Sequence, residues 1–178
     1  MDNVIRVYGY HGTSLTSAEQ IISNGFKLSN NDYDWLGTGI YFFQDAPYRA
    51  WEWSKQQHSH QPAVIRSIIR LENCIDLLDI TWSSIIAEAY GAYIEQCERI
   101  KQPLPRQSKG AHRLDCAIIN YAVGYFEQIS GQSVQSVRGV FLEGTPIFPN
   151  SYLFNRSHVQ IAIRDLSLVE QSSILILE

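Results

Sequence analysis

The fold is decided by residues 10–55, which read YHGTSLTSAEQIISNGFKLSNNDYDWLGTGIYFFQDAPYRAWEWSK. Residues 4–10, which lead into this stretch, are rich in Val, Ile and Tyr and predict a strand. The capping-box pattern of residues 16–19 predicts a helix start, and Gly25 is suited to end that helix in a left-handed conformation. The chain is therefore expected to open with a strand followed closely by a helix.

The rest of the chain continues this mixture of strands and helices. Residues 39–43 predict a short aromatic strand, and Pro47 suits the first turn of a helix over residues 48–58. Hydrophobic spacing predicts helices over residues 81–100 and 113–129, and strands over residues 63–71, 137–143, 158–164 and 173–177. Strands at both ends of the chain predict an α+β fold, with one mixed sheet flanked by helices in a single domain, residues 1–178.

Composition excludes several classes of protein. Of the 178 residues, 45% are hydrophobic and 18% are charged, so the chain is expected to bury a sizeable core. No apolar stretch is long enough to cross a bilayer and no secretory signal is recognisable, which predicts a cytoplasmic protein without a membrane role. Three widely spaced cysteines without a CxxC pair predict reduced thiols and no metal site. The net charge of −4 argues against a protein that coats nucleic acid.

Several residues of the deciding stretch suit a flat, polar ligand. His11 closes the first strand, where an imidazole can donate to a ribose hydroxyl, and Gly12 lets a ligand approach the backbone closely. The amide and carbonyl of Gly12 can pair with a planar carboxamide. Gly39 makes room before the aromatic strand, in which the ring of Tyr41 offers a face for stacking. The alternative is that His11 and Tyr41 are core side chains.

The order of these residues resembles the NAD-binding half of the poly(ADP-ribose) polymerase and diphtheria-toxin class of ADP-ribosyltransferases. That class begins with a strand ending in His-Gly-Ser/Thr, followed by a helix, a Gly-Phe/Leu turn and a Gly-x-Gly-Ile-Tyr-Phe strand. The matching residues are His11, Gly12, Thr13, Gly25, Phe26, Gly37, Gly39, Ile40, Tyr41 and Phe42. The resemblance implies a split, mixed or antiparallel sheet flanked by helices, and NAD as co-substrate without a metal.

The resemblance also implies roles for single residues. His11 is expected to hold the NAD ribose, Gly12 the nicotinamide amide, and Tyr41 the nicotinamide ring by stacking. The further positions implied for NAD binding are Thr13, Gly39 and, as a second stacking aromatic, Trp51 or Trp53.

A late strand carries the third catalytic residue of the class, usually Glu. Alternation in the predicted strand over residues 158–164 puts His158, Gln160 and Ala162 on one face, and the resemblance places Gln160 at the catalytic position. A neutral Gln orients the ribose but stabilises developing positive charge less than Glu does. Transfer of single ADP-ribose units is therefore expected in place of polymer synthesis. The alternative is that Gln160 is an outward-facing strand residue.

Three other polar residues compete for roles near this strand. Glu143 ends the strand over residues 137–143 and is either the missing carboxylate or a solvated strand end. His158 is placed to position or deprotonate an acceptor, and Arg156 to grip a phosphate. The alternative for this pair is a surface His beside a surface Arg.

The leading hypothesis is a mono-ADP-ribosyltransferase that acts on a macromolecule, as bacterial toxins with a neutralising antitoxin and anti-phage effectors of similar size do. The basic residues of the proline-containing loop over residues 102–110, with Arg113 and the Arg156/His158 pair, favour a nucleic-acid acceptor, RNA or DNA, slightly over a protein. The alternatives are a catalytically weak module that binds NAD or ADP-ribose, RNA 2′-phosphotransferase chemistry, and a plain interaction domain.

Overall fold

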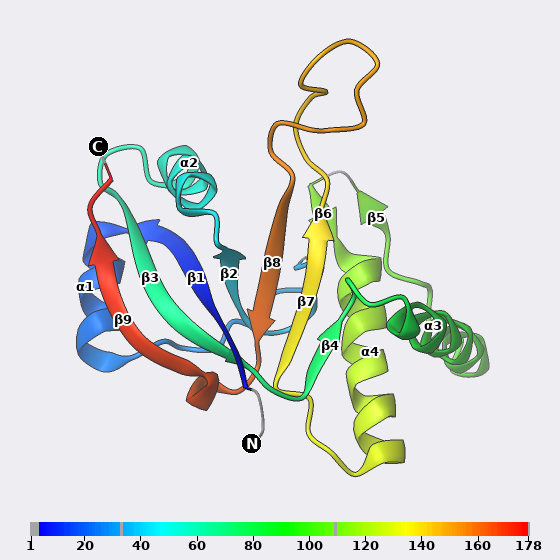
Figure 1. The fold of residues 1–178 in the computed structure, drawn as a ribbon. Helices are drawn as coiled ribbons and strands as arrows, with labels where there is room; N and C mark the ends of the chain where they lie inside the picture. Colours follow the sequence, from blue (N-terminus) through cyan, green and yellow to red (C-terminus); the bar gives the residue numbers. More distant parts are fainter. Residues whose placement is uncertain (1–3, 33, 109, 178) are drawn as a thin grey trace.

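The computed structural model describes residues 4–32, 34–108 and 110–177. Within these ranges the fold is α+β, as the sequence predicts: a mixed, mostly antiparallel seven-stranded sheet is flanked by four α-helices (Figure 1). The elements follow in the order β1 (Ile5–Ser14), α1 (Leu15–Asn24), β2 (Ile40–Gln44), α2 (Pro47–Gln57), β3 (Pro62–Leu71), β4 (Cys74–Asp76), α3 (Thr81–Arg99), β5 (Gln107–Ser108), β6 (Ala111–His112), α4 (Arg113–Ser130), β7 (Ser136–Phe141), β8 (His158–Ile163), a 3-10 helix (Leu166–Leu168) and β9 (Val169–Leu175).

The sheet has the strand order β4-β7-β8-β2-β1-β3-β9, and β4 and β7 are its parallel pair. Strand β1 pairs with β3 along its whole length, from Ile5↔Leu71 to Ser14↔Pro62. Its pairing with β2 on the other side is limited to Gly9↔Gln44 and Tyr10↔Phe43. Beyond Tyr10 the strands β1 and β2 therefore separate, although they remain neighbours in one sheet.

The first helix begins two residues earlier than the capping-box pattern predicts. The hydroxyl of Ser14 accepts a hydrogen bond from the backbone N–H of Ser17 at 3.1 Å, so Ser14 caps the helix and not Thr16. Hydroxyl residues at positions 14, 16 and 17 offer competing caps, and the cap falls on the one where β1 ends. Gly25 ends the helix, as predicted, with a positive φ of 82°, but its ψ of 169° lies outside the left-handed helical conformation.

The short elements were missed by sequence reasoning. Strand β4 and the hairpin of β5 and β6 have too few residues to show a hydrophobic period, so their segments are not recognisable. The last strand, β9, begins at Val169, earlier than the predicted residue 173. The first strand, β1, continues to Ser14, four residues beyond its predicted end at Tyr10. The other predicted helices and strands are present, with boundaries that differ by at most two residues.

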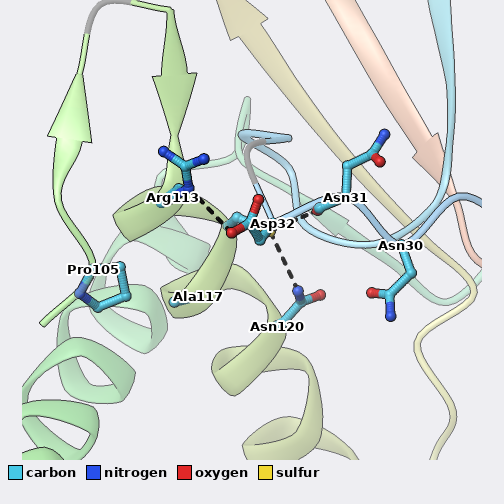
Figure 2. Close-up of a pocket in the computed structure, with 8 residues that line it drawn as sticks. Asn30, Asn31, Asp32, Pro105, Arg113, Ala117 and Asn120 are labelled. Carbon is cyan, nitrogen blue, oxygen red and sulfur yellow. Dashed lines mark hydrogen bonds and ion pairs between the residues drawn. The ribbon is translucent and has the colours of Figure 1, made fainter. Parts of the chain in front are cut away.

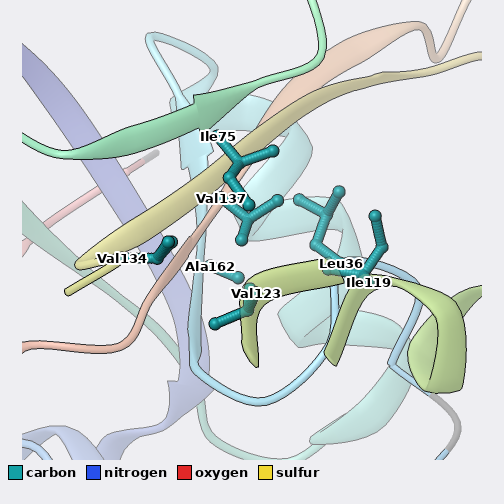
Figure 3. Close-up of a cluster of buried hydrophobic side chains, with 7 residues drawn as sticks. All are labelled: Leu36, Ile75, Ile119, Val123, Val134, Val137 and Ala162. Atoms are coloured by element: carbon teal, nitrogen blue, oxygen red, sulfur yellow. The ribbon is translucent and has the colours of Figure 1, made fainter. Parts of the chain in front are cut away.

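Each face of the sheet is covered by its own apolar cluster. One cluster lies between the sheet and α4, and Figure 3 shows its members: Leu36, Ile75, Ile119, Val123, Val134, Val137 and Ala162. The cluster on the opposite face contains Phe42, Ile161 and Ile163. The predicted alternation of β8 is confirmed, because Ala162 belongs to the first cluster and Ile161 and Ile163 to the second.

Candidate functional site

His11 lies at the point where β1 and β2 separate. Its ring packs edge-on against Phe26, with ring centroids 5.5 Å apart, and also contacts Phe42. The imidazole Nδ1 lies 2.9 Å from the backbone carbonyl oxygen of Tyr41 and donates to it, which leaves Nε2 as the acceptor nitrogen of a neutral ring. Burial lowers the pKa of His11, against a smaller raising effect of this hydrogen bond. The neutral form is thus the favoured one.

The contact of His11 with Tyr41 interrupts the sheet. The Asp45 N–H donates to the Tyr8 carbonyl, so the backbone N–H and C=O of Tyr8 point toward β2. Alternate residues of a strand point their backbone groups to the same side, so those of Tyr10 and Gly12 also point toward β2. Regular pairing would join the Gly12 N–H to the Tyr41 carbonyl, but the pairing of β1 with β2 ends at Tyr10↔Phe43. The Tyr41 carbonyl instead accepts the hydrogen bond from the His11 imidazole. The N–H and C=O of Gly12 consequently face the gap between the two strands.

Helix α2 packs directly on Gly12. A Cβ at this position would lie 2.4 Å from the carbonyl oxygen of Ala50 and 3.2 Å from an indole carbon of Trp53. Trp53 is therefore the tryptophan beside the gap. Trp51 packs with a cluster that includes Tyr10, Phe43 and Val64. The sequence left the choice between these two tryptophans open.

Tyr41 is held on the same face of the sheet as Gly12. Its hydroxyl donates to the Gly37 carbonyl at 2.8 Å and accepts from the Leu36 N–H at 2.9 Å. Burial raises the pKa of this hydroxyl, so it remains protonated. The ring packs beside the apolar cluster that contains Leu36. These contacts of Tyr41 hold the loop that precedes β2 in place.

The space beside the glycines is filled by protein. A Cβ at Gly39 would lie 2.9 Å from the Ile163 carbonyl oxygen, and a Cβ at Gly37 would lie 2.6 Å from Asn120. Thr13 is buried, and its carbonyl accepts from the Ser54 hydroxyl at 2.6 Å. Gly39 and Thr13 thus serve close packing of neighbouring elements here, whereas the sequence suggested room for a flat ligand at Gly39.

Gln160 lies beneath a tryptophan that sequence reasoning did not single out. Trp35 belongs to residues 34–39, here named the covering loop, and its indole Nε1 donates to Gln160 Oε1 at 2.8 Å. Gln160 Nε2 lies 2.9 Å from His158 Nε2, and His158 Nδ1 lies 2.7 Å from the Arg156 carbonyl oxygen. Because a carbonyl oxygen only accepts, His158 donates from Nδ1 to the Arg156 carbonyl, and its Nε2 accepts from the Gln160 amide.

The indole of Trp35 reaches Gln160 because a glycine lies below it. A Cβ at Gly139 would lie 3.1 Å from the outer ring of Trp35, and Gly139 is the cross-strand neighbour of Gln160. Trp35 also packs on Phe141, with ring centroids 4.8 Å apart, and Phe141 in turn contacts His158. Burial lowers the pKa of His158, which favours the neutral ring that accepts from Gln160.

Glu143 and Arg156 are both tied to helix α2. Glu143 pairs with Arg49, whose side chain is only 10% exposed and lies over the ring of Phe43. Arg156 pairs with Glu52 at 2.6 Å. The structure thus brings Glu143, Arg156 and His158 together near the start of β8, but the charged groups of Glu143 and Arg156 are already paired with side chains of α2.

Two residues near the proline-containing loop lie beside carboxylates. Arg113 pairs with Asp32 at 3.1 Å, and His112 Nδ1 lies 3.2 Å from Asp115. Figure 2 shows Arg113 and Asp32 at a cavity of about 290 Å³ between α4 and the segment after α1, which Asn120 and Pro105 also line. Lys109 lies outside the described residues. The ion pair with Asp32 offsets the charge of Arg113 within the basic surface expected for nucleic acid.

In the described ranges, none of the helices combines the length and the apolar character that a membrane span requires. Nor does this part of the chain bring three or more His, Cys, Asp or Glu side chains together in a group that could hold a metal ion.

Comparison with known proteins gives one limited similarity. No family model matches the chain. The chain is 35% identical over 74 residues to an uncharacterized protein, MJ0359, of Methanocaldococcus jannaschii. The similar stretch is 40% of this chain and 35% of the relative, so the chain spans about a third of the relative's length. The similarity names no activity.

Proposed function

We propose that the protein is an NAD-consuming mono-ADP-ribosyltransferase whose nicotinamide site is the gap between β1 and β2. The observation that carries the proposal is the orientation of Gly12. Its N–H and C=O face the gap, because the His11 imidazole takes the Tyr41 carbonyl that regular pairing would give to Gly12. A carboxamide has one donor group and one acceptor, so it is complementary to this backbone pair.

The proposed reaction breaks the glycosidic bond between C1′ of the nicotinamide ribose and the ring nitrogen. The bonding electron pair leaves with the ring, so the pyridinium becomes neutral nicotinamide and positive charge develops on the ribose. A lone pair of the acceptor nucleophile then forms the new bond to C1′, and the nucleophile's proton is released. Water as the acceptor gives free ADP-ribose by the same steps.

The chain's own residues have separate parts in this scheme. In this scheme the nicotinamide ring is flanked by Tyr41, which lies on the same face of the sheet as Gly12, and by Trp53, while His11 offers Nε2 to a ribose hydroxyl. Gln160 has one amide hydrogen beyond the one directed at His158, and this hydrogen orients the ribose. Trp35 covers Gln160, so the indole must move aside before the ribose reaches the amide.

The experiment that tests the proposal is release of nicotinamide from NAD by purified protein. Wild type is expected to release it, and His11→Ala to lose at least about a hundredfold in rate, as expected for a positioning group in a reacting complex. His60→Ala, an exposed histidine after α2, is the matched control and keeps the wild-type rate. No release by wild type contradicts the proposal.

A second candidate is a module that binds NAD or ADP-ribose without turnover. This candidate is favoured because polar side chains around β8 already have partners within the protein. The Gln160 amide is hydrogen-bonded to Trp35 and His158, and Glu143 is ion-paired with Arg49. No free carboxylate among these residues is available to stabilise the developing charge. Saturable NAD binding by calorimetry, without nicotinamide in the same sample, identifies this candidate.

A further inference from the structure

The connection between β7 and β8, residues 142–157, projects from the sheet and is here named the projecting loop (Figure 1). It carries five large apolar side chains at its surface. Tyr152 is 94% exposed, and the other four are each more than half exposed: Leu142, Ile147, Phe148 and Leu153. Apolar groups exposed together in one place mark contacts with proteins or with membranes.

The backbone of the projecting loop is hydrogen-bonded within the loop. The Ile147 N–H donates to the Leu153 carbonyl at 2.9 Å, and the Ser151 N–H donates to the Phe148 carbonyl at 3.0 Å. The Leu153 N–H donates to the Ser151 hydroxyl at 3.0 Å. An unpaired backbone group is costly in lipid, so these bonds lower the cost of moving the tip, residues 147–153, out of water.

The composition of the projecting loop also suits an apolar medium. Residues 144–154 read GTPIFPNSYLF and contain no charged side chain. Pro146 and Pro149 have no backbone N–H that would need a partner. Nucleic acids are bound mainly through cationic contacts to phosphate, and this segment has none to offer.

The charges nearest to the tip lie together at the base of the loop. The Arg156 N–H donates to the Glu143 carbonyl at 3.2 Å, so these two residues lie side by side where the loop leaves the sheet. Their side chains pair with Arg49 and Glu52 of α2. A charged base below an uncharged tip separates a part of the loop that stays in water from a part that can leave it.

A protein partner fits the tip less well than a lipid surface. Stable protein–protein interfaces bury about 800 Å² on each partner and involve roughly 20–30 residues a side, whereas this apolar surface consists of five side chains on one projection. Two hollows on the described surface, beside Asn120 and beside His60, are lined mainly by polar residues and do not match an apolar tip of a second copy. A fluid lipid surface needs no preformed groove, and Tyr is enriched where membranes meet water.

We propose that the tip of the projecting loop inserts into the surface of a lipid bilayer, while Glu143 and Arg156 remain in water. The contact is peripheral, weak and reversible, because its strength comes from a small apolar area. It departs from the absence of a membrane role that the sequence predicts, since that prediction rests on spanning and signal segments. The proposal is independent of NAD chemistry.

The test is sedimentation of the protein with phosphatidylcholine vesicles. Wild type is expected to bind, and binding is expected to persist at high salt because the tip has no charge to screen. The double variant Phe148→Ser/Tyr152→Ser is expected to lower the partition coefficient at least about tenfold. Ile80→Ser, at a residue 84% exposed before α3, is the matched control and keeps the wild-type value.

A second measurement locates the inserted segment without removing apolar groups. Phe148→Trp places an indole at the tip, and its fluorescence is expected to be quenched by brominated phosphatidylcholine beyond the quenching of the four native tryptophans. Ile80→Trp is expected to show no added quenching.

The proposal is overturned if wild type stays in the supernatant, if the double variant partitions as wild type does, or if high salt abolishes binding. Loop-dependent self-association, or loop-dependent capture of a protein, without vesicle binding assigns the tip to that partner and also overturns it. Because no NAD is present, the outcome of the nicotinamide-release experiment does not affect these results.

Discussion

The indole Nε1 of Trp35 donates to Oε1 of Gln160 over 2.8 Å, and this bond closes the covering loop over the polar face of β8. In the proposed mode of binding, NAD must displace the indole to reach Gln160, so this bond is expected to oppose NAD binding. Trp35→Phe keeps an aromatic ring over Gly139 and removes the N–H. We expect the KM for NAD to fall about fivefold, which corresponds to one hydrogen bond of about 1 kcal/mol. Trp82→Phe, at an indole that packs on Phe126 in the helical layer, is the control. A raised KM in Trp35→Phe would show that the indole binds NAD.

Gln160→Glu tests the coupling of this residue to His158. A carboxylate still accepts from Trp35 but has no N–H for His158 Nε2, which lies 2.9 Å from the Gln160 amide nitrogen. His158 is expected to take up a proton on Nε2, so its pKa rises, and nicotinamide release is expected to accelerate about tenfold because the charge stabilises the positive ribose. NMR titration of the histidines and the rate of release measure both effects. Gln171→Glu, at an exposed position of β9, controls for the added charge. Unchanged titration of His158 contradicts the hydrogen-bond assignment.

The stability of the protein is expected to depend on pH through its two packed histidines. Burial lowers the pKa of both His11 and His158 below the ordinary value of about 6.5. As pH falls below about 6.5 the unfolded chain binds protons that the folded chain does not, so the free energy of unfolding decreases there and is level above it. Urea denaturation at several pH values measures this, and His158→Asn is expected to have a shallower dependence. A free energy of unfolding that increases as the pH falls through this window is the contrary result.

Gly12→Ala tests the packing of α2 on β1. Its Cβ would lie 2.4 Å from the Ala50 carbonyl, so the helix must shift, and we expect a loss of about 1–3 kcal/mol in the free energy of unfolding. Gly91→Ala is the matched control, because this glycine lies within α3 with nothing near its Cβ position. There the substitution is expected to stabilise by about 0.5–1 kcal/mol. Equal effects of the two substitutions would show that α2 does not pack on Gly12 in this way.

Periodic patterns were sufficient to predict the long elements. The spacing of apolar residues along α3 and α4 and the alternation along β8 reflect burial on a single face, so the sequence contains that information locally. Strand β4 has three residues and shows no period, and its place is set by parallel pairing with β7, which no local pattern reveals.

The candidate site was predictable as a set of residue types but not in its contacts. The sequence indicated His11, Gly12 and Tyr41, yet the hydrogen bond from His11 to the Tyr41 carbonyl depends on strands that separate after Tyr10. Trp35 was missed because its role depends on Gly139, about a hundred residues further along the chain, which leaves room for the indole. The glycines were visible in the sequence, whereas the atoms that fill the space beside them were not.

The most direct measurement is the backbone amide resonance of Gly12 during titration of labelled protein with nicotinamide. If the Gly12 N–H and C=O hold the carboxamide, this resonance is expected to move and saturate, whereas Gly91 in α3 does not respond. A Gly12 amide that is unaffected at nicotinamide concentrations that saturate other resonances would contradict the site between β1 and β2.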